Sequence, residues 1–184
     1  MRTFLSLGLL FVATSVWAGT LEGVTLPDTV EIGDKTLQLN GMGIREATIF
    51  KVDVYVAGLY LENKTADAQK ILDTDGTRRI VMKFVRDVDR DDLVKAWGKG
   101  FEKNNKNYEA IKDRIAELNK YMADTKKGQV MTFTYIPGVG TEVAIDGHTH
   151  GKIAGSDFGR ALMAVWLGPQ PPNSGLKNGL LGKS

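Results

Sequence analysis

Apolar and polar residues alternate through the first part of the chain, and this pattern predicts strands. Across residues 19–39 the apolar positions stand mostly two apart and are interrupted at Pro27-Asp28 and Gly33-Asp34. A period of two broken by turn residues predicts a hairpin. Asn40-Gly41-Met42-Gly43 follows and predicts a tight turn, because Asn and Gly tolerate a positive φ. Residues 44–61 are rich in β-branched and aromatic side chains and predict one long strand.

Later segments show both helical and strand patterns. Apolar spacing and capping residues predict helices at residues 66–73, 90–103, 108–122 and 158–167, with a short helical segment from Ser174. The expected N-caps of the first, second and fourth helices are Thr65, Asp89 and either Ser156 or Asp157. Further strands are predicted at residues 79–85, 129–136, 141–145 and 150–153. Tight hairpins with little β–α–β alternation predict the α+β class, with a mainly antiparallel sheet covered on one face by helices.

The N-terminus has the pattern of a secretory signal peptide. A positively charged start precedes an apolar run over residues 4–13 and a small-residue cleavage site at Val16-Trp17-Ala18. We expect residues 1–18 to be a cleaved signal peptide and residues 19–184 to be one domain, in a periplasmic or secreted protein. An uncleaved anchor is the alternative, but the apolar run is only about half the length that spans a bilayer.

Composition and charge narrow the function. The chain has no cysteine, which excludes disulfides, thiolate metal sites and cysteine nucleophiles. Its formal net charge of +2 includes Arg2, so the mature chain is near neutral and carries no charge signal for nucleic acid. No stretch after the signal peptide is long and apolar enough to predict a membrane span.

His148 and His150 are the only histidines, and with Asp146 they form a D-x-H-x-H pattern. In a strand these side chains would share one face, as metal ligands can. Asp146-Gly147 is also a hairpin-turn dipeptide, and no other Cys or His completes a tetrahedral site. We therefore favour an exposed hairpin and predict no metal and no cofactor. The chain contains no nucleophile elbow, zinc-protease motif, phosphate loop or dinucleotide fingerprint.

One arginine and several aromatic residues are the candidates for ligand binding. Arg45 stands at the start of the long predicted strand, where it either forms a solvated ion pair or points into a cleft and binds an anion. The predicted helices carry aromatic residues that either fill the core or line an apolar pocket: Trp97, Phe101, Tyr108 and Trp166. Arg45 with Tyr55 or Tyr60 could anchor the acidic group of a ligand in such a pocket.

Two regions of the sequence carry a resemblance. A Gly-x-Arg at Gly43–Arg45 leads into a strand that ends in GLYLE at residues 58–62, and the chain closes with FGRALMAVWLG at residues 158–168 and LKNGLLG at residues 176–182. These motifs resemble the chalcone isomerase family, and the last two resemble its bacterial chalcone-isomerase-like members. The resemblance implies an open-faced β-sandwich with a helical layer that encloses a cleft, and it favours the periplasm as the location.

The resemblance also bears on activity. Arg45 matches the arginine that stabilises the reacting oxygen in true chalcone isomerases, but Tyr55 stands where those enzymes have a threonine. No tyrosine occurs in residues 88–92, where the family's catalytic tyrosine is expected, and the family's asparagine falls near Gly98-Lys99. Non-catalytic members bind fatty acids through the arginine and a neighbouring tyrosine.

Three functions follow from this comparison. We expect first a non-catalytic protein that binds a small amphipathic or fatty acid through Arg45, Tyr55, Tyr60 and Trp97. The alternative is an isomerase, an intramolecular lyase acting on a chalcone-like or other small substrate with Arg45 as electrophile. The third is a structural or partner-binding protein whose own side chains fill the cleft.

Overall fold

A seven-stranded antiparallel sheet forms the centre of the protein. The computed structural model describes residues 18–47 and 52–183. The strands lie in the sheet in their sequence order: β3 (Thr29–Ile32), β4 (Lys35–Ala47), β5 (Val52–Leu61), β6 (Arg78–Phe84), β7 (Val130–Ile136), β8 (Gly140–Ile145) and β9 (His148–Ile153). Each strand is therefore joined to its neighbour by a direct reversal or by a helical insertion, as the hairpin signals in the sequence predict.

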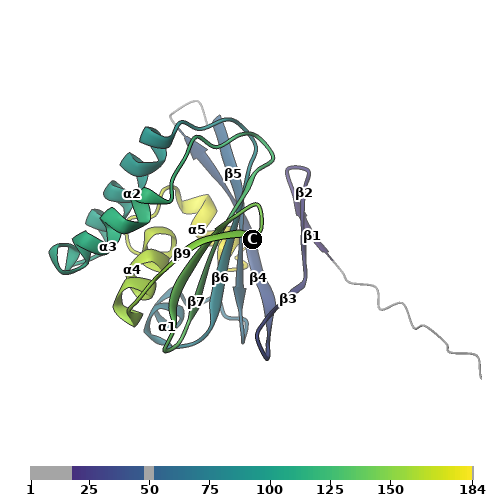
Figure 1. Ribbon diagram of the computed structural model, residues 1–184. Coiled ribbons are helices and arrows are strands. Elements are labelled where there is room, and N and C mark those ends of the chain that lie inside the picture. Colours follow the sequence, from purple (N-terminus) through teal and green to yellow (C-terminus); the bar gives the residue numbers. More distant parts are fainter. Residues whose placement is uncertain (1–17, 48–51, 184) are drawn as a thin grey trace, which may run out of the picture.

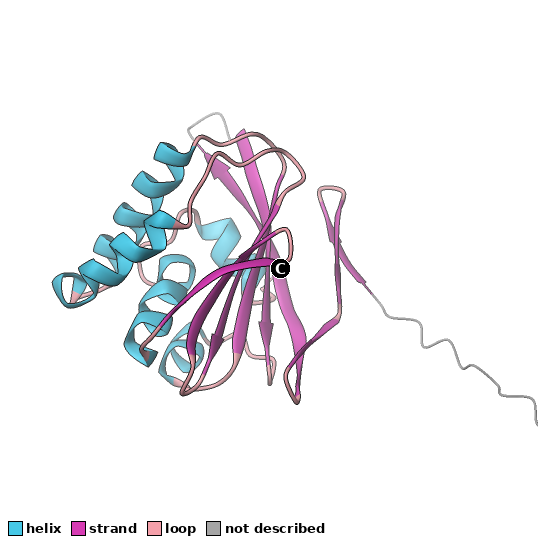
Figure 2. Cartoon of the chain, viewed as in Figure 1, coloured by secondary structure: helices cyan, strands magenta, loops and turns pink. Residues whose placement is uncertain are grey.

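Helices cover one face of this sheet and a hairpin covers part of the other (Figures 1 and 2). The helices are α1 (Ala68–Asp73), α2 (Arg90–Asn104), α3 (Tyr108–Lys120), α4 (Ser156–Leu167) and α5 (Ser174–Leu180). The hairpin consists of β1 (Ala18–Leu21) and β2 (Val24–Pro27), which pair only with each other. This arrangement confirms the predicted α+β class with one helix-covered face. No helix within the described ranges is long and apolar enough to cross a membrane.

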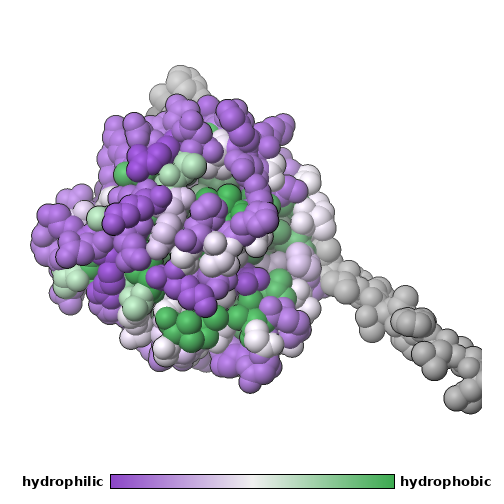
Figure 3. Space-filling model, viewed as in Figure 1, coloured by the Kyte–Doolittle hydropathy of each residue, from purple (hydrophilic) through white to green (hydrophobic). Residues whose placement is uncertain are grey.

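The two faces of the sheet bury two separate hydrophobic clusters. The larger cluster lies between the sheet and the helices, and the smaller one lies under the β1–β2 hairpin. Strand β5 supplies both, because successive side chains of a strand point to opposite faces. Tyr55 belongs to the helix-side cluster, and Val56 and Tyr60 belong to the hairpin-side cluster. Apolar residues show in a few separate areas of the mostly hydrophilic surface in Figure 3.

The predicted turn at residues 40–43 is wrong, because this segment lies inside β4 with only a bulge between Leu39 and Gly41. Its glycines allow α5 to approach the strand. A Cβ on Gly41 would overlap the backbone oxygen of Gly179, and one on Gly43 would overlap that of Leu176. Close backbone contact therefore explains these glycines, and no reversal of the chain is involved.

The Asn40 side chain is also used inside the strand. Its Nδ2 donates to the Leu180 carbonyl over 2.8 Å, and its Oδ1 accepts from the Thr65 amide over 2.7 Å. Asn40 is buried, so these bonds satisfy polar atoms that would otherwise be costly to remove from water. The asparagine that suggested a turn links β4 to α5.

Three other expectations need correction. The single strand predicted over residues 44–61 is the end of β4 and the whole of β5, which pair antiparallel with Ala47 opposite Val52; the intervening residues 48–51 lie outside the described part. The hairpin predicted over residues 19–39 is two hairpins, β1–β2 and β3–β4. Asp67, rather than Thr65, caps α1, because its carboxylate accepts from the Gln69 and Lys70 amides.

The other helices begin close to where the sequence predicts. Helix α2 follows Asp89, and α4 begins at Ser156 after Gly155, which takes the N-cap position and has a positive φ. The predicted signal peptide falls almost entirely on residues 1–17, which lie outside the described part. Its cleavage stays a prediction.

Candidate functional site

Strand register places Arg45 beside Tyr55. The two residues are direct partners in the β4–β5 pair, close to the end of the described ladder. Directly opposite residues of an antiparallel pair point to the same face. Tyr55 belongs to the helix-side cluster, so Arg45 also faces the helical layer. Arg45 is half-buried, and its Nη1 donates to the backbone oxygen of Glu46.

Tyr55 is buried beneath helix α4. The Trp166 indole of that helix donates its Nε1–H to the Tyr55 hydroxyl over 3.0 Å, and the Phe84 ring meets the Tyr55 ring edge-on at 5.7 Å. Burial raises the pKa of Tyr55 to about 12, although the Trp166 hydrogen bond and the Arg45 charge act in the opposite direction. Tyr55 is therefore a neutral phenol at physiological pH and keeps its proton.

Trp97 packs against Trp166. The two indoles meet at 5.5 Å between ring centroids, and Phe133 contacts both of them. The Trp97 Nε1–H points to the Met122 sulfur at 3.2 Å. Arg45, Tyr55, Trp166 and Trp97 are therefore connected by successive contacts, which begin at the charged guanidinium and end among apolar rings.

Tyr60 lies elsewhere. Its ring is in the hairpin-side cluster, and its hydroxyl donates to the Pro27 carbonyl over 2.8 Å. It stands five residues from Tyr55 on the same strand, an odd separation that places the two side chains on opposite faces. The structure brings Tyr55, and not Tyr60, to Arg45. That Arg45, Tyr55, Tyr60 or Trp97 binds a ligand remains a prediction.

Trp166 is the residue that the sequence did not single out for this site. The sequence showed Trp166 as one of several aromatic residues on the predicted helices. It gave no sign that Trp166 contacts Tyr55, which lies 111 residues away in the chain. Its position in FGRALMAVWLG, a motif that carried the resemblance, was the one available signal.

The histidines form no metal centre in the described ranges, where no group of three or more His, Cys, Asp or Glu residues is placed to hold a metal. His148 and His150 are exposed on the edge strand β9. The Asp146 carboxylate instead accepts from the Val130 amide and the Gln129 side chain, at 2.8 and 2.9 Å. These bonds lower the pKa of Asp146 and tie the β8–β9 turn to the start of β7.

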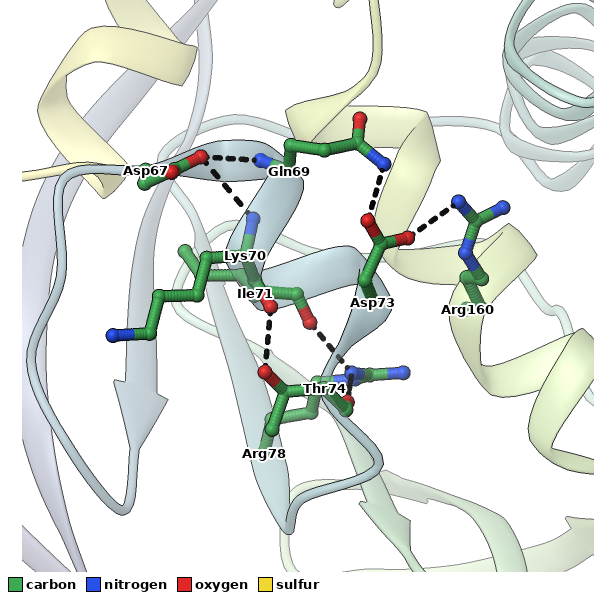
Figure 4. Close-up of polar contacts among 8 residues, drawn as sticks. All are labelled: Asp67, Gln69, Lys70, Ile71, Asp73, Thr74, Arg78 and Arg160. Carbon is green, nitrogen blue, oxygen red and sulfur yellow. Dashed lines mark hydrogen bonds and ion pairs between the residues drawn. The ribbon is translucent and has the colours of Figure 1, made fainter.

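Two surface hollows lie away from Arg45. One, of about 370 Å³, is lined by residues of α1 and its flanking loops, and the other, of about 740 Å³, lies between α1, α4 and the α2–α3 connection. Figure 4 shows the polar contacts around α1 beside the first hollow. The buried Arg78 donates through Nη1 to the carbonyls of Ile71 and Thr74, both at 2.8 Å, and so holds the end of α1. Arg78 therefore has a structural use.

Comparisons with known proteins agree with this fold. Among solved structures, the chain is similar to a fatty-acid binding protein of Arabidopsis thaliana, with a TM-score of 0.73 and 18% sequence identity over 90% of this chain and 96% of that one. At that identity the likeness concerns the fold, and it confirms the expected sheet-and-helix architecture. No curated protein matches the chain. The family model described as chalcone isomerase-like matches residues 18–182. Because the match covers nearly the whole chain, the protein belongs to the chalcone isomerase-like family.

Proposed function

We propose that the protein binds a small amphipathic acid, such as a fatty acid, without catalysis, and that Arg45 and Tyr55 hold the acid's carboxylate. We further propose that it does so in the periplasm, after removal of residues 1–18. The ligand class rests on family membership and on the fold shared with a plant fatty-acid binding protein. The anchoring residues and the location rest on the sequence and on the site geometry.

The pairing of Arg45 with Tyr55 carries this proposal. A guanidinium is permanently charged, and beside it lies a phenol that stays neutral and protonated, with its pKa at about 12. A carboxylate that reached this point would accept one charge-assisted hydrogen bond and one from a hydroxyl. Arg45 is only half-buried, so it is close enough to solvent for an incoming ligand to meet it.

The aromatic side chains behind the pair suit an apolar tail. Tyr55, Trp166 and Trp97 run from the polar end into the helix-side cluster, with Phe84 and Phe133 beside them. Each of these rings contacts at least one other, so an acyl chain has to push some of them aside. We therefore expect binding to change the fluorescence of Trp97 and Trp166.

The same geometry argues against catalysis by the family's reaction. General acid–base catalysis works best with groups whose pKa lies near the working pH, and that of Tyr55 is far above it. The segments where the sequence lacks the expected tyrosine and asparagine, residues 88–92 and Gly98-Lys99, lie at the start and in the middle of α2. Arg45 alone would have to perform the chemistry.

Titration with decanoate tests the proposal. Decanoate added to the wild-type protein should quench or shift the tryptophan emission and give a saturable heat of binding. The Arg45→Gln variant should lose about 10- to 100-fold in affinity, because a hydrogen bond to a charged group contributes about 1.5–3 kcal/mol.

Arg79→Gln is the matched control. Arg79 is also a strand arginine, but it lies opposite Tyr60 on the other face of the sheet, where its Nε donates to the Thr134 hydroxyl. It should bind decanoate as the wild type does. Equal affinities of the wild type and Arg45→Gln would contradict the anchoring role, and no binding by the wild type would contradict the ligand class.

The location is tested separately by mass spectrometry of the protein made in bacterial cells. Recovery from the periplasmic fraction with Gly19 as its first residue is the expected result. Recovery from the cytoplasm with Met1 retained would contradict export.

A further inference from the structure

The hydrogen bond between Trp166 and Tyr55 has a fixed direction. Both side chains are buried, and the indole Nε1 lies 3.0 Å from the phenol oxygen. An indole N–H donates and has no lone pair with which to accept. Tyr55 is therefore the acceptor in this contact, and its own proton must point elsewhere.

No described residue accepts that proton. Among residues 18–47 and 52–183, the Trp166 indole is the hydrogen-bond partner of the Tyr55 hydroxyl. Within that part of the chain, this buried O–H has lost its bond to water and gained none in exchange. A ligand atom with a lone pair would remove this cost.

Arg45, on the neighbouring strand, reinforces the same preference. A guanidinium has only donors, and register sets it directly opposite Tyr55. The Arg45 guanidinium and the Tyr55 hydroxyl thus both present hydrogen-bond donors. A carboxylate offers lone pairs and a charge to both groups, whereas an alcohol has no charge and brings a proton that needs an acceptor of its own.

We propose that Trp166 is a positioning residue that fixes the Tyr55 hydroxyl as a donor, so that the Arg45–Tyr55 pair selects carboxylates over alcohols of the same chain length. This inference rests on the proposed function and adds the reason for its head-group specificity. Trp166 need not touch the ligand head group to have this effect.

The test compares decanoate with 1-decanol in the full chain. The wild type should bind decanoate at least 10-fold more tightly than decanol. In Trp166→Phe, which keeps an aromatic ring and removes the N–H, the Tyr55 hydroxyl is free to turn. Decanoate affinity should fall about 3- to 10-fold while decanol affinity stays the same or rises, so the acid-to-alcohol ratio should fall.

Trp97→Phe separates this effect from a loss of packing. Trp97 is in the same aromatic cluster, but its N–H points to the Met122 sulfur and away from Tyr55. Any loss of affinity in this variant should affect decanoate and decanol alike and leave their ratio unchanged. An equal fall of the ratio in both tryptophan variants would overturn the positioning role.

A spectroscopic measurement on the unchanged protein covers the case in which Trp166→Phe does not fold. The indole N–H resonance of Trp166 reports the strength of its bond to Tyr55. When decanoate accepts from the Tyr55 hydroxyl, the phenol oxygen becomes a better acceptor, and the indole proton should move downfield. Decanol should move it less. An unmoved indole resonance at saturating decanoate would overturn the proposal.

These outcomes differ from failure of the proposed function. If the wild type does not bind decanoate, the ligand class itself is wrong. If it binds, and Arg45→Gln loses the binding, but Trp166→Phe keeps the wild-type ratio, the anchor stands and the positioning role of Trp166 fails.

Discussion

A methyl group on Gly43 should weaken the contact between β4 and α5. An alanine Cβ at this position would overlap the Leu176 carbonyl oxygen and lie 2.9 Å from the Leu176 Cα. Both are backbone atoms, so no side-chain rotation can relieve the overlap. Either α5 moves outward by a fraction of an ångström, or it leaves the sheet.

The energies decide between these responses. Overpacking that is relieved by small backbone shifts costs about 1–3 kcal/mol. Release of α5 and of Leu181, which follows it as the C-cap, would expose three buried leucines: Leu176, Leu180 and Leu181. At about 1.5–3 kcal/mol for each side chain, release would cost roughly 5–9 kcal/mol. The helix should therefore shift and stay docked, and Gly43→Ala should lose about 1–3 kcal/mol of unfolding free energy.

Urea unfolding and thermal melting measure this loss. For a protein of this size, each kcal/mol lowers the melting temperature by about 2–4 °C, so we expect a decrease of about 2–12 °C. Gly98→Ala in helix α2 is the control: a Cβ there meets no atom within 4 Å, and alanine favours a helix over glycine by up to about 1 kcal/mol. A Gly43→Ala protein as stable as the wild type would refute the reasoning, because α5 could not then be seated as the structure has it.

Two further predictions concern polar contacts of the scaffold. Asn40→Ala should lower the unfolding free energy in urea by about 2–5 kcal/mol, because the Leu180 carbonyl and the Thr65 amide both lose a buried partner; a loss below about 1 kcal/mol would contradict it. The Asp157 carboxylate accepts two 2.6 Å bonds from Arg114, which hold its pKa below the usual value. Its stabilising effect should be present above about pH 4 and fade as the pH falls further, so Asp157→Asn should flatten the acid side of the stability curve measured by urea unfolding between pH 2 and 5. An unchanged slope in the variant would count against this pairing.

The sequence by itself was enough for the class of fold and for most elements. Alternation along β6, β7 and β8 and the three- and four-residue spacing of α2, α3 and α4 are local patterns. The spacing of apolar residues within one segment shows which face of that helix or strand is buried, so neighbouring residues are enough to predict the element. The Gly-x-Arg motif likewise marked Arg45 without knowledge of its surroundings. Parity along β5 places Tyr55 and Tyr60 on opposite faces, and the prediction of both as ligand contacts did not take this into account.

Only the tertiary structure decided what covers each face and which distant groups meet. Asn40 and the glycines after it resemble a turn locally. In the fold, the glycines make room for α5, and the Asn40 side chain donates to the carbonyl of Leu180, 140 residues later in the chain. Tyr55 is the partner of Arg45 because the β4–β5 register sets the two residues opposite each other, and Trp166 reaches Tyr55 from 111 residues away. Local propensity cannot register such contacts, because their energy arises only when remote segments pack against one another.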